Sequence, residues 1–164
     1  GDWSSDVCSS DLGALKAGRH WHEAAVLYRD KLQQPLEAAR CLEQGGMLLE
    51  AIELYEKLHL HETVGDLYSK LAEAESARAA YVLATQQYHQ QHQWLDAARV
   101  EEQKLNDIEA ALRTLESSWP DDISAAQCLQ QKLQLLARLD RADEARARLL
   151  KLRDEVLEIG RAHV

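Results

Sequence analysis

The segment GMLLEAIELYEKL (Gly46–Leu58) decides the fold class of this chain. Its apolar residues Ala51, Leu54, Tyr55 and Leu58 are spaced by three or four positions, which is the period of one helix face and not the alternation of a strand. A helix of about ten residues is only marginally stable alone in water. The segment therefore predicts a short helix that is held by packing against neighbouring helices.

The motif of this segment, an acidic residue followed by small and then apolar positions, recurs along the chain. The acidic residues that begin its copies are Glu23, Glu37, Glu50, Glu62, Glu75, Asp96, Glu109 and Glu144. Repetition of this kind is typical of stacked units that cannot bury their apolar faces alone. Four residues of the shared stripe are therefore expected to be buried between helices: Ala51, Leu54, Leu67 and Leu71.

Turn-forming residues separate the copies and set the expected helix boundaries. We expect helices at 20–33, 36–44, 47–58, 61–71, 74–91, 94–104, 107–118, 122–139 and 141–157. Short connections favour antiparallel neighbours, so the predicted fold is all-α, a right-handed solenoid of short antiparallel helix pairs. We expect one continuous array whose weakest joint lies at Trp119–Asp122.

The two ends of the chain differ from the rest. The codons GAC GTG TGC TCT TCC GAT CT encode Asp6–Leu12, and their reverse complement encodes the closing residues of the chain. This string resembles a short-read sequencing adapter. Residues 1–12 and 158–164 are therefore expected to be adapter-derived and not native. The helical repeat domain then spans residues 13–157, as a fragment of a longer protein.

Gly46–Leu58 resembles the second helix of a tetratricopeptide repeat, which favours the pattern GxxxEAIxxYxKA. Gly18–Tyr28 is similar with one additional residue, and the start of the last helix, from Ala142, is a looser match. The resemblance extends over most of residues 13–157. Its spacing departs from the family, because that family repeats every 34 residues or so whereas this chain steps by 12 to 14 between Glu37 and Ser76. The shorter step is similar to degenerate solenoids of coat and transport complexes. The resemblance implies protein or peptide binding on a superhelical groove, and it supplies no ligand-contacting residue.

Composition and charge restrict the kinds of partner that this chain is expected to bind. The formal net charge is −9, which argues against nucleic acid and anionic lipid as partners. No apolar run has the length of a membrane span. Cys41 and Cys128 lie far apart, on leucine-rich stripes and without metal-ligand spacing, so they indicate structural cysteines in a reducing, cytoplasmic compartment.

The sequence predicts no catalytic, cofactor or metal site. It lacks a nucleophile elbow, a Walker loop, a dinucleotide fingerprint and an HExxH motif. His20/His22 and His59/His61 are separated by two positions and diverge on a helix. His89 and His92 share a face, but no carboxylate or thiol stands at ligand spacing beside them.

A run of eight polar residues, Gln86–Gln93, is the candidate partner-binding site. The residues expected to contact a partner are Gln86, Gln87, Tyr88, His89, Gln90 and His92, whose amide, phenol and imidazole groups offer adaptable donors and acceptors. The alternative is a solvated helix end before Trp94. Trp21, Trp94 and Trp119 could be exposed binding residues, but Trp21 and Trp94 stand at the start of a unit and are expected to be packing residues.

Basic residues concentrate in the last helix, where Glu144 is spaced to pair with Arg148. We expect a salt-bridged surface there, with phosphate binding as the alternative. Two functions remain open. The first is a non-catalytic scaffold that binds a protein or peptide, and the second is a helical arm of a larger enzyme or ATPase-associated machine.

Overall fold

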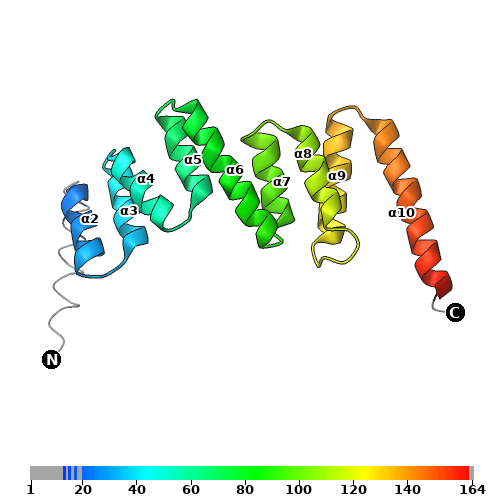
Figure 1. Ribbon diagram of the computed structural model, residues 1–164, viewed down its shortest axis with the longest axis horizontal. Helices are drawn as coiled ribbons and strands as arrows, with labels where there is room; N and C mark the ends of the chain where they lie inside the picture. The colour runs from blue at the N-terminus through cyan, green and yellow to red at the C-terminus, as the bar shows by residue number, and fades with distance from the viewer. Residues whose placement is uncertain (1–12, 14, 16, 18–19, 163–164) are drawn as a thin grey trace. The chain divides into compact units, whose positions relative to one another are not determined.

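The computed structural model describes Gly13, Leu15, Ala17 and residues 20–162, with side chains as far as Glu158. Every regular element in this part of the chain is a helix (Figure 1). The helices are α2 Trp21–Asp30, α3 Pro35–Gln44, α4 Leu48–Lys57, α5 His61–Lys70, α6 Ala74–Gln90, α7 Trp94–Gln103, α8 Ile108–Ser117, α9 Ala125–Arg138 and α10 Ala142–Ala162. The all-α prediction is confirmed, and each expected helix is present with its ends shifted by up to a few residues.

Most of the links between helices contain a residue in the left-handed backbone conformation. Seven of the eight links between α2 and α10 contain a residue with φ near +55° or, at Gly46, +79°, and the link 118–124 between α8 and α9 contains none. The residues with positive φ are Gln33, Gly46, His59, Ala72, His92, Asn106 and Asp140. A left-handed residue directly after a helix allows the next N–H to bond back to a carbonyl near the helix end, which is the Schellman closure. The first four of these residues stand 13 positions apart, so this closure sets the period of the repeat.

The link between α4 and α5 illustrates the closure. His59 has φ +56°, and the Leu60 N–H then donates to the Tyr55 carbonyl at 3.0 Å. Leu60 is also the N-cap of α5, and its own carbonyl accepts from Val64 at 3.1 Å. Three residues therefore end one helix and begin the next without a side-chain cap.

The chain forms two compact units, one ending at Ala84 and the other beginning at Thr85. In the first unit α2 packs on α3, α3 on α4 and α4 on α5; in the second α7 packs on α8, α8 on α9 and α9 on α10. The chain direction alternates from helix to helix within each unit (Figure 1). Successive helices thus pack against their neighbours, as in a solenoid.

The prediction of a weak joint at Trp119–Asp122 is wrong, because the division falls within α6. The residues around Asp122 are tied on several sides. Asp122 accepts hydrogen bonds from the Ser124 N–H at 2.8 Å and from the Trp94 indole at 2.9 Å. The Ser118 hydroxyl donates to the Leu115 carbonyl. These bonds satisfy the polar groups of the longest link and hold it against the helices.

The core of the first unit is built on small side chains. Ala24, Ala38, Ala39 and Ala51 are fully buried, and so is Leu67. Alanine lets helix backbones approach closely, and larger side chains fill the spaces beside it. The burial prediction is confirmed for Ala51 and Leu67. Leu54 and Leu71 are only partly buried, packed at the edge of the same core.

Tyr55 and Tyr81 each connect their own helix to the helix before it. Tyr55 is 3% exposed, and its hydroxyl donates to a carboxylate oxygen of Glu43 at 3.1 Å. Burial, together with the hydrogen bond to Glu43, raises the pKa of Tyr55 to about 12. Lys70 donates to the other oxygen of Glu43 at 2.7 Å. The apolar stripe therefore ends in a polar contact that ties α3, α4 and α5 together.

Gly65 has a packing role in the middle of α5. A Cβ atom at this position would lie 2.5 Å from the ring of Tyr81, which is far inside van der Waals contact. Tyr81 is buried, and its hydroxyl donates to Asp66 at 2.7 Å. The ring is fixed at both its face and its hydroxyl, so it cannot move aside easily.

The terminal predictions remain untested. Residues 1–12 lie outside the described residues. Helix α10 continues through residues 158–162, so this part of the expected adapter-derived end has helical backbone whatever its origin.

Gly65→Ala tests the close approach to Tyr81. Helix propensity alone would make the alanine variant more stable by about 1 kcal/mol. We expect it to be less stable by about 1–3 kcal/mol, because the added methyl group overpacks the contact. Urea unfolding followed by circular dichroism measures the sign. A stabilised variant would show that the ring yields.

Ala72→Gly tests the cost of the left-handed link. Ala72 is exposed with φ +61°, and glycine has no Cβ penalty in this conformation. We expect the variant to gain about 0.5–1 kcal/mol of unfolding free energy. Ala79→Gly, at an exposed position within α6, is the matched control and should lose about 1 kcal/mol. Equal losses at both positions would contradict the assignment of strain to the link.

Candidate functional site

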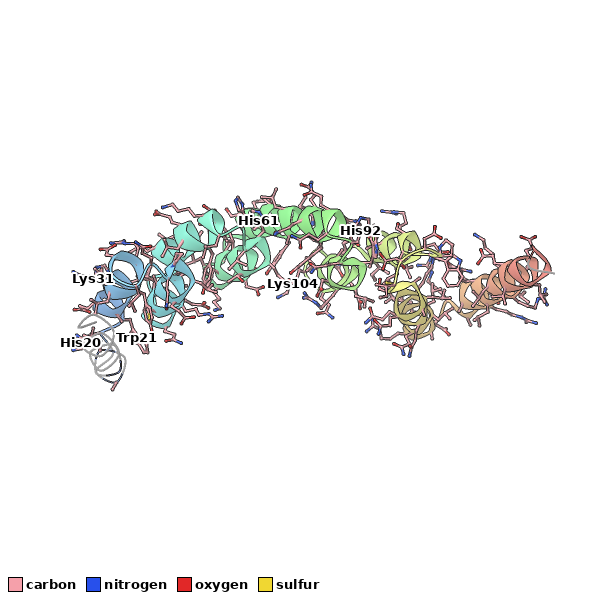
Figure 2. All side chains as sticks on the ribbon, turned by 90° about the horizontal axis from the view of Figure 1, so that it is seen from below. His20, Trp21, Lys31, His61, His92 and Lys104 are labelled. Atoms are coloured by element: carbon pink, nitrogen blue, oxygen red, sulfur yellow. The ribbon has the colours of Figure 1, made fainter. Side chains whose placement is uncertain are left out.

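The polar strip Gln86–Gln93 divides between two environments. Gln86, Gln90 and His92 are exposed, whereas Gln87, Tyr88 and His89 are half-buried. His92 belongs to the link after α6 and has φ +56°; Figure 2 shows it beyond the end of that helix. The strip therefore offers a discontinuous surface to a partner.

His89 belongs to the second unit and joins a group of polar side chains within it. Its Nε2 atom lies 3.1 Å from a carboxylate oxygen of Glu101 and 3.3 Å from the Thr114 hydroxyl. Glu101 and Thr114 are both buried. The second carboxylate oxygen of Glu101 has no hydrogen-bond partner among the described residues. His89 thus fastens α6 to α7 and α8, which is a structural role.

His89 and His92 flank Trp94 and do not form a metal pair. Their rings lie 5.5 and 5.4 Å from the indole ring, each in an edge-on arrangement. Edge-on aromatic contacts of this kind add to packing stability. Within the residues that the structure describes, no group of three histidine, cysteine or carboxylate side chains is placed to hold a metal ion.

Trp21, Trp94 and the two cysteines of the described residues occupy the packing positions expected for them. Trp21 and Trp94 are half-buried against the two hydrophobic cores. Trp119 lies beneath the Arg148 guanidinium, whose central carbon is 5.3 Å from the ring centre. Cys41 and Cys128 are buried and form no disulfide, which agrees with a structural role.

The second unit contains a groove that the sequence analysis missed. It runs between α7 and α9, and its cavity volume is about 420 Å³. Its floor includes apolar residues of α7, α8 and α9, and its walls are polar. The lining residues are Leu95, Asp96, Ala98, Arg99, Glu102, Gln103, Leu115, Gln131, Gln134, Leu135 and Arg138.

Charges on the walls of this groove, named the α7/α9 groove from here on, are paired with one another. Arg99 lies 3.3 Å from Asp96, and Arg138 pairs with Glu102. Three glutamines, Gln103, Gln131 and Gln134, expose carboxamides on the walls. Each carboxamide offers two donors and an acceptor, which is the complement of a peptide backbone. In the sequence, the only feature that indicates this groove is the high glutamine content of residues 127–134.

A second cavity, of about 520 Å³, belongs to the first unit. It lies between α5 and α6 and is lined mainly by apolar side chains such as Val64, Ala80 and Leu83. His59 and His61 stand at its edge, with His61 at the start of α5 (Figure 2). Their rings are 5.9 Å apart and tilted, so they line a surface and do not chelate.

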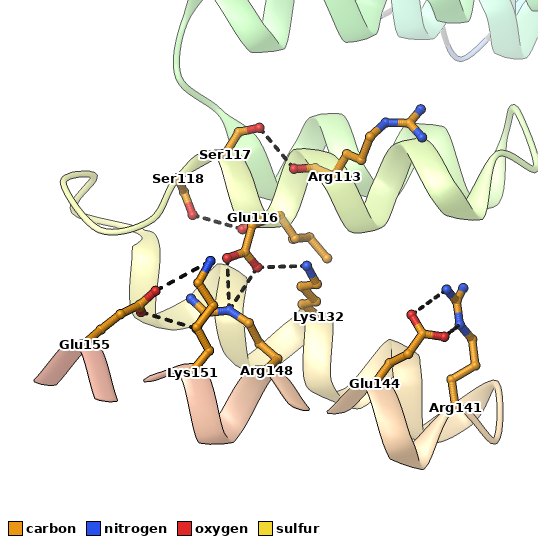
Figure 3. A network of polar contacts seen from close by, with 11 residues as sticks. Arg113, Glu116, Ser117, Ser118, Lys132, Arg141, Glu144, Arg148, Lys151 and Glu155 are labelled. Atoms are coloured by element: carbon orange, nitrogen blue, oxygen red, sulfur yellow. Dashed lines mark hydrogen bonds and ion pairs between the residues drawn. The ribbon is translucent and has the colours of Figure 1, made fainter. Parts of the chain in front are cut away.

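Helix α10 is held to the second unit by an ion-pair group, the Glu116 cluster, made of Glu116, Lys132, Arg148, Lys151 and Glu155 (Figure 3). The Glu116 carboxylate lies 2.8 Å from the Lys132 Nζ atom and 2.9 Å from the Arg148 Nε atom. Arg148 is 7% exposed and also reaches Glu155 at 3.4 Å. This pairing connects α8, α9 and α10 through one carboxylate.

The prediction that Glu144 pairs with Arg148 is wrong. Glu144 pairs with Arg141 at 2.5 Å, and Arg141 also reaches Glu109 at 2.6 Å. Arg148 faces the helix packing instead, where Glu116 is its partner. The last helix is therefore a salt-bridged surface, in which Glu116 and Glu109 of α8 join pairs made within the helix itself.

No helix in the described residues is long and apolar enough to cross a membrane. Comparison of the chain with models of known protein families, with curated protein sequences and with solved structures finds no match. The functional argument therefore depends on the groove and surfaces described above.

Glu116→Gln tests the Glu116 cluster. Burial acts to raise the pKa of Glu116, but Lys132 and Arg148 outweigh it and lower this pKa below 4.5. The ionised carboxylate therefore stabilises the fold above about pH 4.5, and this stabilisation is lost as the pH falls through the lowered pKa. The glutamine variant leaves Arg148 buried with only its longer contact to Glu155 at 3.4 Å. We expect a loss of about 1–3 kcal/mol at pH 7 that shrinks on acidification.

Glu109→Gln is the matched control for this experiment. Glu109 pairs with Arg141 on the surface, with 62% of its side chain exposed. We expect a change below about 0.5 kcal/mol, since exposed ion pairs contribute little. Urea unfolding between pH 3 and pH 7 measures both variants. Equal effects at pH 7 would contradict a special role for the buried pair.

Proposed function

We propose that this chain is a non-catalytic scaffold that binds a protein or peptide segment in the α7/α9 groove. The groove itself carries the proposal: it joins an apolar floor to walls with exposed carboxamides and internally paired charges. An apolar side chain of the partner fits the floor near Leu95 and Leu135. Gln103, Gln131 and Gln134 would then hydrogen-bond the partner's backbone on either side.

The balance of charge on the walls favours a partner segment without strong charge. Asp96 and Glu102 are already matched by Arg99 and Arg138, so neither sign of ligand gains a net attraction. Carboxamide contacts to the backbone tolerate many sequences. The floor then becomes the main source of selectivity, through the size of the apolar side chain that it accepts.

The resemblance to tetratricopeptide repeats agrees with this proposal, because stacked helical repeats present grooves between alternate helices. The acidic net charge of −9 disfavours nucleic acid and anionic membranes as partners. Buried cysteines without a disulfide agree with a reducing, cytoplasmic setting. We retain the exposed residues Gln86, Gln90 and His92 of the polar strip as a second, separate contact for a partner.

Peptide selection with the full chain as bait tests the proposal. Peptides selected from a random display library are titrated by fluorescence anisotropy against wild type and against Gln131→Ala/Gln134→Ala. Alanine keeps helix propensity, and the loss of two or more hydrogen bonds should weaken binding at least about tenfold. Gln127→Ala/Gln130→Ala changes two exposed glutamines of α9 outside the groove and should leave the affinity unchanged.

The polar strip is tested in the same titration. Gln87→Glu/Gln90→Glu/Gln91→Glu keeps the helix and adds three negative charges. If this variant loses binding while the groove variant does not, the partner site is the strip and the groove proposal is wrong. If selection yields no peptide that either variant weakens, neither site is a peptide-binding site.

A further inference from the structure

Helix α10 carries a row of exposed aliphatic side chains that the fold does not use. Leu149, Leu150, Val156 and Leu157 are each about half exposed, at 50, 46, 55 and 52%. None of them lines the α7/α9 groove. Four large aliphatic residues within nine positions of one helix form a contiguous apolar surface, which marks an interaction site more often than an ordinary solvated surface.

The spacing of buried and exposed residues separates two faces of this helix. Ala145, Arg148, Leu152 and Glu155 are buried or half-buried, and their spacing of three or four residues defines the face that packs on the second unit. The exposed aliphatic residues lie on the adjoining side. We name this surface the α10 face; it comprises Arg146, Leu149, Leu150, Arg153, Val156 and Leu157.

Two arginines lie in the middle of the apolar row. Arg146 and Arg153 are exposed and stand seven residues apart, about two helical turns, so they share one line along the helix. Arg153 donates to Asp154, which is itself exposed. This arrangement differs from the packed face, where Arg148 is matched by Glu116 and Glu155. The α10 face thus presents positive charge within an apolar surface.

The charge pattern selects the kind of partner. In a parallel pair of α10 helices, Arg146 and Arg153 would face their own copies. In an antiparallel pair they would be buried against leucine and valine without an anion from the partner helix. Both arrangements are unfavourable. A helix with aliphatic residues and carboxylates spaced seven apart would satisfy both parts of the surface. We propose that the α10 face binds an acidic amphipathic helix of another protein.

Two synthetic helix-forming peptides of about 15 residues serve as probes. They share one leucine face and differ only at two positions seven residues apart, which are glutamate in one peptide and lysine in the other. Fluorescence anisotropy with the full chain measures their affinities. We expect the glutamate peptide to bind at least about tenfold more tightly, with an advantage that falls as salt is added.

Charge reversal at the surface should reverse this preference. Arg146→Glu/Arg153→Glu should bind the lysine peptide more tightly than the glutamate peptide. Arg78→Glu/Arg113→Glu reverses two exposed helical arginines elsewhere and should keep the wild-type preference. Leu149→Gln/Val156→Gln should weaken both peptides while leaving the helical circular dichroism unchanged.

Three results would overturn the proposal. Equal affinity for the two peptides would remove the role of the arginines, and no binding of either peptide would remove the site. A concentration-dependent dimer that Leu149→Gln/Val156→Gln abolishes in sedimentation would show that a second copy of the chain occupies the face. Because the α10 face and the α7/α9 groove have no residue in common, either site can fail without the other.

Discussion

The left-handed residue in the short helix links is the constraint on which the rest of the structure depends. It lets the chain close one helix by backbone hydrogen bonds and begin the next. In most of the links this takes only three residues. Helices of ten residues follow from this spacing in the first unit. Such short helices cannot be stable alone, so each must bury its apolar stripe on a neighbour, and stacking is the result.

Close approach between helices follows from the same constraint. Short helices offer few contacts, and the contacts must therefore be tight. Fully buried alanines and the contact of Gly65 with the Tyr81 ring supply this closeness. The polar ends of the tyrosines, and the pairing of Arg148 with Glu116, then fix the helices at positions where apolar packing alone would allow sliding.

Helix content and the core stripe could be predicted because both depend on local spacing in the sequence. The left-handed links could not be foreseen at Ala72 or His59, because non-glycine residues there give no local signal of positive φ. The α7/α9 groove depends on which glutamines of α9 face α7, a matter of three-dimensional packing. The inward turn of His89 was missed for a similar reason: its partners Glu101 and Thr114 lie 12 and 25 residues further along the chain.

The alternation of helix direction has a consequence for how such a chain can change in length. Removing one 13-residue repeat would deliver the following helix to its slot pointing the opposite way, with its stripe on the wrong side. Removing 26 residues restores direction and stripe together. Insertions and deletions in this architecture should therefore be tolerated in pairs of repeats. The chain can gain or lose whole helix pairs, although its sequence repeats with every single helix.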